Sequence, residues 1–199
     1  MRSDAASGGH LNNELANCFL LSTGFPLTLL GVKRIAKLFG ELKGGEITES
    51  AMSDYAAETL ADLEWTFQIT GALYSKLNQF DAFVGLSLLY FAAASFTETA
   101  HRLGRASLCG DGFLLRNNAK FRQSAEECFA LARDGNSTDT ESLRQKCVAT
   151  LSEFDVAGLS RADQCNWYPV ESEDLRCGAS KLGVTPQEME DFLVRYGMV

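Results

Sequence analysis

The sequence has few of the residues from which metal sites and disulfide frameworks are built. It contains only two histidines, and its six cysteines form no C-x-x-C pair. Zinc sites usually draw their ligands from such close pairs, so no metal site is expected. We expect the cysteines to be buried free thiols, with structural disulfides as the alternative, and Cys128 and Cys147 lie on the apolar stripe of a likely helix.

Positive charge is also scarce in this chain. Eighteen Lys and Arg residues stand against 26 Asp and Glu residues, which gives a formal net charge of -8 and a pI near 4.8. Such a chain has no general electrostatic attraction to nucleic acid or to an anionic membrane surface. The first ten residues contain no apolar signal-peptide core. We therefore expect a soluble, cytoplasmic protein that binds neither nucleic acid nor membrane.

Proline is rare and strand-like alternation is missing, so the sequence predicts an all-α fold. Apolar residues recur at helical spacing in seven segments. The first segment begins at Pro26, and the other six cover residues 50–77, 80–103, 118–132, 140–154, 171–182 and 186–196. Pro26 suits the first turn of a helix, where its missing N–H has no partner in any case. Gly44 and Gly45 are expected to end that first helix.

Capping patterns mark the starts of three of these helices. Asn118 is a candidate N-cap, and Thr138 and Glu141 have the spacing of a capping box. Thr185 and Glu188 have the same spacing, with a proline at the first helical position between them.

The segment over residues 80–103 is apolar nearly all round. Its uncharged stretch between Asp81 and Glu98 has 16 residues, fewer than the roughly 20 that a bilayer requires. The preferred interpretation is a central buried helix, with a transmembrane span as the alternative. Glu98 and His101 are three residues apart on this helix and are expected to form a structural pair, with a Glu-oriented base as the alternative.

The segment STGFPLTLLG, residues 22–31, resembles the last flavin-contacting segment of FAD-dependent oxidoreductases related to tryptophan halogenases. Four further blocks keep the order of that family: residues 89–98 (LYFAAASFTE), 102–105 (RLGR), 112–115 (GFLL) and 166–170 (NWYPV). The resemblance covers nearly the whole chain from Ser22 onward. It implies that the chain is the C-terminal part of such a flavoprotein.

That resemblance implies a division of the chain into three parts. Residues 1–14 would be a flexible N-terminus, and residues 15–45 would be a remnant of the FAD-binding domain with its last helix. Residues 46–199 would form a compact, bundle-like helical domain on the substrate side of the flavin.

The chain also departs from the family. No G-x-G-x-x-G motif is present, although it is this motif that places a dinucleotide pyrophosphate on a helix N-terminus. Cys18 and Phe19 stand where the family has Asp-Pro, and the family's catalytic lysine would lie in the absent half. We therefore assign no catalytic residue, and expect the chain alone to be inactive. The alternative is a non-catalytic helical protein that acts through protein contacts.

The resemblance nevertheless implies candidate site residues. Backbone N–H groups at a helix N-terminus, beside a glycine, can approach an anion closely. The cofactor-binding candidates for FAD are Ser22, Thr23, Gly24, Phe25 and Pro26. The candidates for an aromatic substrate pocket are Tyr90, Trp167 and Tyr168, with core packing as the alternative.

Two partners are compatible with an incomplete flavoprotein. One is a separate FAD-binding half, and the other is a second copy in a homodimer through the first helix. A missing domain would leave exposed apolar surface near residues 22–30.

Overall fold

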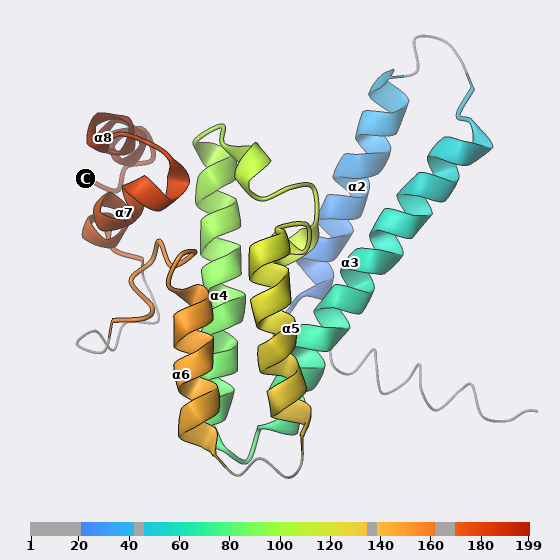
Figure 1. Ribbon diagram of the computed structural model, residues 1–199. Coiled ribbons are helices and arrows are strands. Elements are labelled where there is room, and N and C mark those ends of the chain that lie inside the picture. The colour runs from blue at the N-terminus through green and yellow to red at the C-terminus, as the bar shows by residue number, and fades with distance from the viewer. Residues whose placement is uncertain (1–20, 42–45, 135–138, 162–169) are drawn as a thin grey trace, which may run out of the picture. The chain divides into compact units, whose positions relative to one another are not determined.

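The fold is all-α, as the sequence predicts. The computed structural model describes residues 21–41, 46–134, 139–161 and 170–199. These ranges contain seven α-helices and three short 3₁₀-helices, and they contain no strand (Figure 1).

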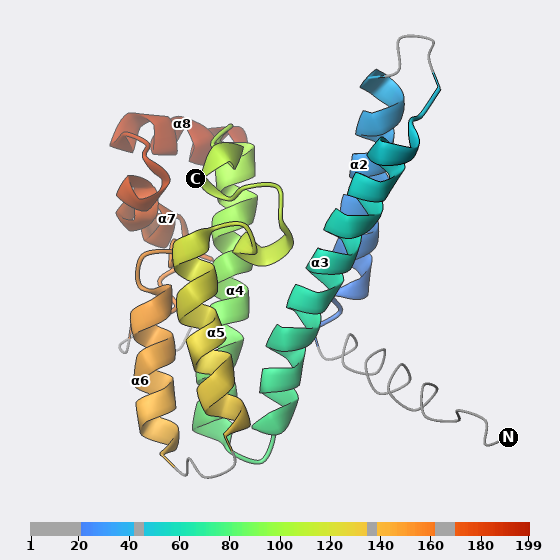
Figure 2. The same ribbon diagram turned by 45° about the vertical axis from the view of Figure 1, so that its right-hand side comes forward.

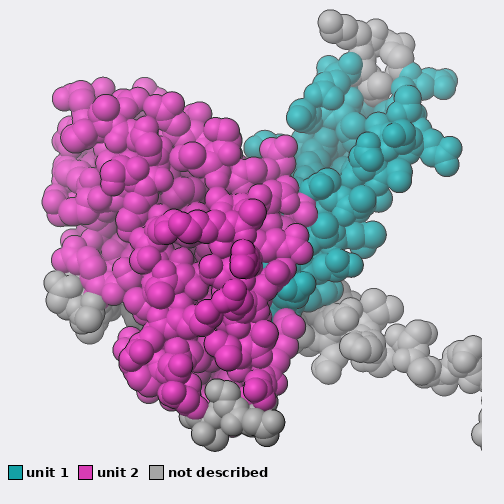
Figure 3. Space-filling model, viewed as in Figure 1, with its two compact units in different colours: residues 1–74 teal, residues 75–199 magenta. Residues whose placement is uncertain are grey.

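The chain divides into two compact units, residues 1–74 and 75–199 (Figure 3). The sequence-based division after residue 45 rested on the Gly44-Gly45 break and on the family resemblance, and it stays a prediction. The two units are described separately below.

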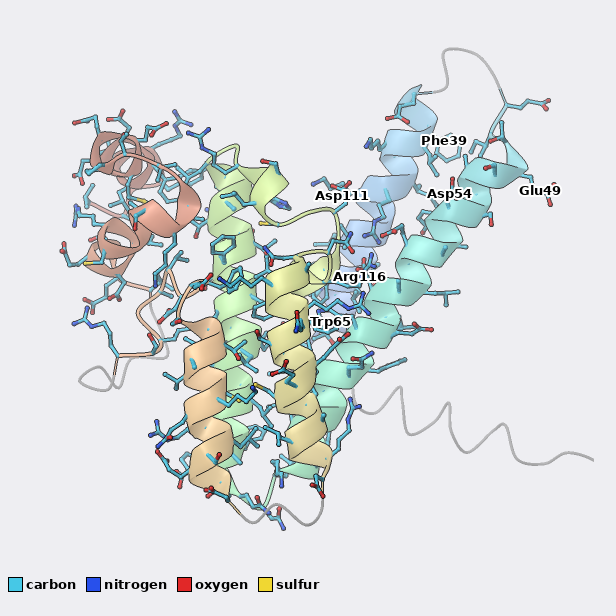
Figure 4. The ribbon with its side chains drawn as sticks, in the orientation of Figure 1. Phe39, Glu49, Asp54, Trp65, Asp111 and Arg116 are labelled. Atoms are coloured by element: carbon cyan, nitrogen blue, oxygen red, sulfur yellow. The ribbon has the colours of Figure 1, made fainter. Side chains whose placement is uncertain are left out.

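Unit 1 is built on an antiparallel pair of helices, α2 (Gly24–Glu41) and α3 (Glu49–Ser75) (Figures 1 and 2). Phe39 lies near the end of α2 and Asp54 near the start of α3, as the antiparallel arrangement requires (Figure 4). Gly31 is the one buried residue in the part of α2 that the structure describes, and a Cβ there would lie 3.4 Å from the Tyr55 hydroxyl. The face of α2 that carries Gly31 is therefore the face that meets α3.

Unit 2 is organised around α4 (Phe80–Arg102), which runs beside α5 (Ala119–Arg133) and α6 (Thr140–Leu151) (Figures 1 and 2). Helix α4 is long and apolar enough to cross a membrane by length and composition. In unit 2 it is the central helix, and Leu86, Leu89 and Phe96 are among its buried residues. A Cβ on Gly85 would lie 3.2 Å from the Arg144 Cα, so the missing side chain allows α4 and α6 to approach closely.

Three phenylalanines join these helices in the core of unit 2. The Phe154 ring, which follows α6, lies 5.4 Å from the Phe96 ring and 5.2 Å from the Phe121 ring, with both pairs edge to face. Phe121 is also the residue whose backbone N–H donates to the Asn118 side chain, which confirms Asn118 as the N-cap of α5. The cap thus fixes where α5 begins and where one ring of the core lies.

A strained turn connects α4 to α5 through η1 (Ala106–Leu108) and η2 (Phe113–Leu115). Leu114 and Leu115 have φ values of 47° and 59°, in the left-handed region that L-residues avoid. Asp111 and Arg116, which are labelled in Figure 4, lie on either side of η2. Both leucine side chains are buried, and this burial helps to hold the strained backbone.

The C-terminal helices confirm one capping prediction and divide one predicted helix into two elements. Helix α8 (Pro186–Arg195) begins with the predicted box, in which Thr185 and Glu188 each accept a hydrogen bond from the other's backbone N–H. The single helix expected over residues 171–182 is instead α7 (Ser172–Gly178) followed by η3 (Ala179–Leu182). A Cβ on Gly178 would lie only 2.9 Å from the Val156 Cα, so the chain changes helix type at a close contact with Val156.

The N-cap of α6 is Asp139, whose carboxylate accepts a hydrogen bond from the Ser142 N–H at 3.0 Å. Thr138 was the expected first residue of the box and lies outside the described residues. Because Asp139 caps the helix, Glu141 falls within its first turn and pairs with Arg144 instead of closing a box.

Candidate functional site

Residues 22–26 form the entry to α2. Leu21, Ser22 and Thr23 make a turn, and the helix begins at Gly24. Ser22 has a φ of 52°, in the left-handed region, and Thr23 is fully buried. The Thr23 carbonyl accepts the N–H of Leu27 at 3.2 Å, which closes the first turn around Pro26. Pro26 therefore lies in the first turn, as predicted.

Among the described residues, the surface in front of Gly24 is open. A Cβ built on Gly24 would have no atom of these residues within 4 Å, and the adjacent Phe25 side chain is 73% exposed. A ligand group could therefore approach the backbone here, as the resemblance implies for FAD. Binding of FAD by residues 22–26 stays a prediction.

An apolar stripe on α2 continues from this entry. The stripe consists of four exposed side chains at positions i, i+4, i+7 and i+14: Phe25, Leu29, Val32 and Phe39. These side chains share one face of the helix, away from Gly31, and Phe39 is 59% exposed. This stripe is the exposed apolar surface that the missing-domain hypothesis expects near residues 22–30.

The three residues expected to line an aromatic pocket are not gathered in the described part of the chain. Tyr90 is half-buried on α4 and its ring lies edge-on to Phe91, with the centroids 5.4 Å apart. Trp167 and Tyr168 lie outside the described residues. The pocket role of all three stays a prediction.

A cavity of about 390 Å³ lies in unit 2 beside Phe91, on the C-terminal half of α4. Its apolar walls come from four separate parts of the chain and include Phe91, Ala94, Leu159, Leu175, Phe192 and Met198. Val170 also lines it, and Val170 ends the NWYPV block of the resemblance. Residues of the 89–98 block therefore line the same cavity as Val170; the rest of the 166–170 block lies outside the described residues.

Two hydroxyl side chains of α4 line the same cavity, Ser95 and Thr99. The Ser95 hydroxyl donates to the Ala92 carbonyl at 3.2 Å, which leaves its oxygen able to accept. Thr99 is 7% exposed, and within the described residues its hydroxyl makes no hydrogen bond. The cavity thus combines apolar walls with a hydroxyl, that of Thr99, to which a ligand could bind.

Charged side chains at the edge of the cavity neutralise one another. The Arg102 guanidinium binds the Glu98 carboxylate, with the Arg102 Nε 2.6 Å from Oε1, and it lies 4.8 Å from the centre of the Tyr196 ring. The expected pair of Glu98 with His101 is therefore replaced by a pair with Arg102, one helical turn away.

The thiols of the described residues are free. Cys109, Cys128 and Cys147 are buried, and Cys177 is exposed. Burial raises the pKa of the Cys109 thiol, and a hydrogen bond with Cys128 together with burial raises the pKa of Cys147. No group of three or more His, Cys, Asp or Glu side chains in the described ranges could hold a metal ion.

The polar lining of the cavity is an ion pair and two hydroxyls. The charged lining residues, Glu98 and Arg102, are paired with each other, and the hydroxyls belong to Ser95 and Thr99. Comparisons with protein-family models, with curated proteins and with solved structures find nothing that matches this chain.

Proposed function

We propose that this chain is the C-terminal part of an FAD-dependent oxidoreductase similar to the tryptophan halogenases, and that α2 packs against the FAD-binding half of that enzyme. The observation that carries the proposal is the exposed apolar stripe of α2. A helix of a globular protein normally turns such a stripe toward a core, so an outward stripe marks a surface that a partner covers.

The position of the stripe favours the FAD-binding half as its partner. The stripe begins at Phe25, within the segment that resembles a flavin-contacting segment. A domain that packs on the stripe would therefore also reach the open backbone at Gly24. In this proposal residues 22–26 complete an FAD site whose phosphate-binding part belongs to the other half.

In this proposal the chain alone does not catalyse the reaction. The FAD-binding half would hold the cofactor and supply the catalytic residues, in the cytoplasm. The helices of unit 2 would supply the substrate side, and the cavity there is lined by residues of the 89–98 block together with Val170. The second candidate is a non-catalytic protein in which another copy of the chain covers the stripe, and it rests on the same exposed side chains.

The test uses the FAD-binding half of a tryptophan-halogenase-like flavoprotein, expressed without its own C-terminal region. The two proteins are mixed and separated by size-exclusion chromatography with light scattering. We expect the wild-type chain to co-elute with the FAD-binding half. The double variant Phe25→Asp, Leu29→Asp should elute separately, because two carboxylates cannot be buried in an apolar interface without a partner.

A matched control keeps the added charge but moves it off the stripe. The double variant Ala56→Asp, Ala57→Asp changes two exposed positions of α3 and should still co-elute. Separate elution of the wild-type chain would contradict the proposal. A homodimer of the chain alone that the stripe variant dissociates would support the second candidate instead.

A further inference from the structure

The cavity of unit 2 has the size and lining of a small-molecule site. Its volume of about 390 Å³ lies within the range of ligand pockets, and its walls are mainly apolar. This volume suits a ligand of about two or three aromatic rings. The argument uses residues of unit 2 alone and does not rest on the proposed function.

Thr99 offers a hydrogen-bonding group to a ligand. A side-chain hydroxyl can donate one hydrogen bond and accept others, so it can pair with either kind of polar group on a ligand. The Thr99 side chain is 7% exposed and lines the cavity, yet it makes no hydrogen bond inside the part of the chain that the structure describes. Ser95, one turn earlier, adds a second oxygen that can accept.

The pairing of charges at the edge of the cavity indicates that the ligand is neutral. The Arg102 guanidinium is held by Glu98 on one side and by the Tyr196 ring on the other. A carboxylate ligand would have to displace Glu98, and an ammonium ligand would lie next to Arg102. Neither charged ligand would gain a free counter-charge from these residues.

We propose that this cavity binds a neutral, mainly apolar small molecule, and that the Thr99 hydroxyl anchors its single hydrogen-bonding group. Phe91 and Phe192 form aromatic walls for the apolar body, and Ala94 leaves the space that the body occupies.

The test is a fluorescence titration with N-phenyl-1-naphthylamine, a neutral aromatic probe with one N–H group. We expect saturable binding to the full chain at one site. Thr99→Val keeps the side-chain volume but removes the oxygen, and it should weaken binding about fivefold, the effect of one ordinary hydrogen bond. Thr99→Ser keeps the hydroxyl and should bind within about twofold of wild type.

A second variant tests the location of the probe. Ala94→Phe places a ring inside the cavity and should abolish binding, whereas Ala130→Phe adds the same ring at an exposed position of α5 and should not. Circular dichroism reports whether each variant is folded. If Ala94→Phe fails to fold, the comparison of the probe affinities of Thr99→Val and Thr99→Ser still tests the proposal.

Three results would overturn the proposal. The first is undiminished probe binding by a folded Ala94→Phe variant, which would place the probe elsewhere, for instance on the α2 stripe. The second is equal affinity of the Thr99→Val and wild-type chains. The third is tighter binding of the anionic analogue 1-anilinonaphthalene-8-sulfonate than of the neutral probe, since the charges at the cavity edge are already paired.

Discussion

Arg34 of α2 and Asp62 of α3 form the ion pair that links the two helices of unit 1. The Arg34 Nη1 lies 2.6 Å from the Asp62 Oδ2, and the Asp62 side chain is 1% exposed. Exposed ion pairs contribute little to stability, but a buried carboxylate depends on its partner because it has lost its hydration. The pair therefore fixes the face that α2 turns toward α3, and with it the outward direction of the apolar stripe.

The first prediction concerns this ion pair. Arg34→Met should leave the Asp62 carboxylate buried without its counter-charge and destabilise the chain by about 2–4 kcal/mol. The double variant Arg34→Met, Asp62→Leu should recover most of that loss, because two apolar side chains can replace a buried pair. Urea unfolding measures both, with Glu64→Gln on the exposed side of α3 as a control. Equal stability of the single variant and wild type would show that the pair is not needed.

The second prediction compares two glycines inside helices. A Cβ on Gly71 of α3 would meet nothing within 4 Å, so Gly71→Ala should stabilise the chain by about 0.5–1 kcal/mol through helix propensity. A Cβ on Gly85 of α4 would lie 3.2 Å from the Arg144 backbone, so Gly85→Ala should destabilise by about 1–2 kcal/mol because α6 must shift. Urea unfolding compares the two, and a change in the same direction for both would contradict the close contact of α4 with α6.

The third prediction concerns pH. Hydrogen bonds from Arg144 and then Gln145 lower the pKa of Glu141 from 4.5 to about 2. A lowered pKa means that the folded chain favours the carboxylate, so its stabilising effect is complete above pH 4.5 and is lost as the pH falls toward 2. A ¹³C NMR titration of the Glu141 carboxyl group should give a midpoint near 2. Arg144→Met should move that midpoint toward 4.5, and an unchanged midpoint would contradict the assigned cause.

The fourth prediction concerns the cysteines. In a Cys18→Ser, Cys165→Ser background, four cysteines remain, and one of them, Cys177, is exposed. We expect Ellman's reagent to modify one thiol per folded chain and four in denaturant, because the three buried thiols are inaccessible to the reagent. Adding Cys177→Ser should abolish the reaction of the folded chain. Rapid reaction of a second thiol would show that the packing around Cys128 and Cys147 opens readily.

Local chemistry explains what the sequence could predict about the fold. The caps at Asn118 and Thr185 were identifiable because each depends on a side chain and a backbone N–H only three residues apart. The split between α7 and η3 was not identifiable, because it depends on the contact of Gly178 with Val156, 22 residues earlier in the chain. The N-cap at Asp139 was missed because two adjacent residues, Thr138 and Asp139, can both cap a helix.

Only some of the residues that line the cavity could be predicted from the sequence. Tyr90 is a pocket candidate from the sequence, and its neighbour Phe91 lines the cavity, since consecutive residues of a helix point about 100° apart. Four of the lining residues lie on one face of α4, and their helical spacing is visible in the sequence: Phe91, Ser95, Glu98 and Arg102. The opposite wall comes from α7 and α8, and no local pattern places those helices beside α4.

The central claim is that this chain completes a flavin site without holding the flavin by itself. The most direct measurement is the visible absorbance of the purified chain after incubation with FAD and removal of free FAD on a desalting column, alone and together with the FAD-binding half. We predict no flavin bands from the chain alone, and retained flavin at about one per complex when both halves are present. Flavin retained at about one per chain by the chain alone, or no gain in retention when the halves are combined, would contradict the claim.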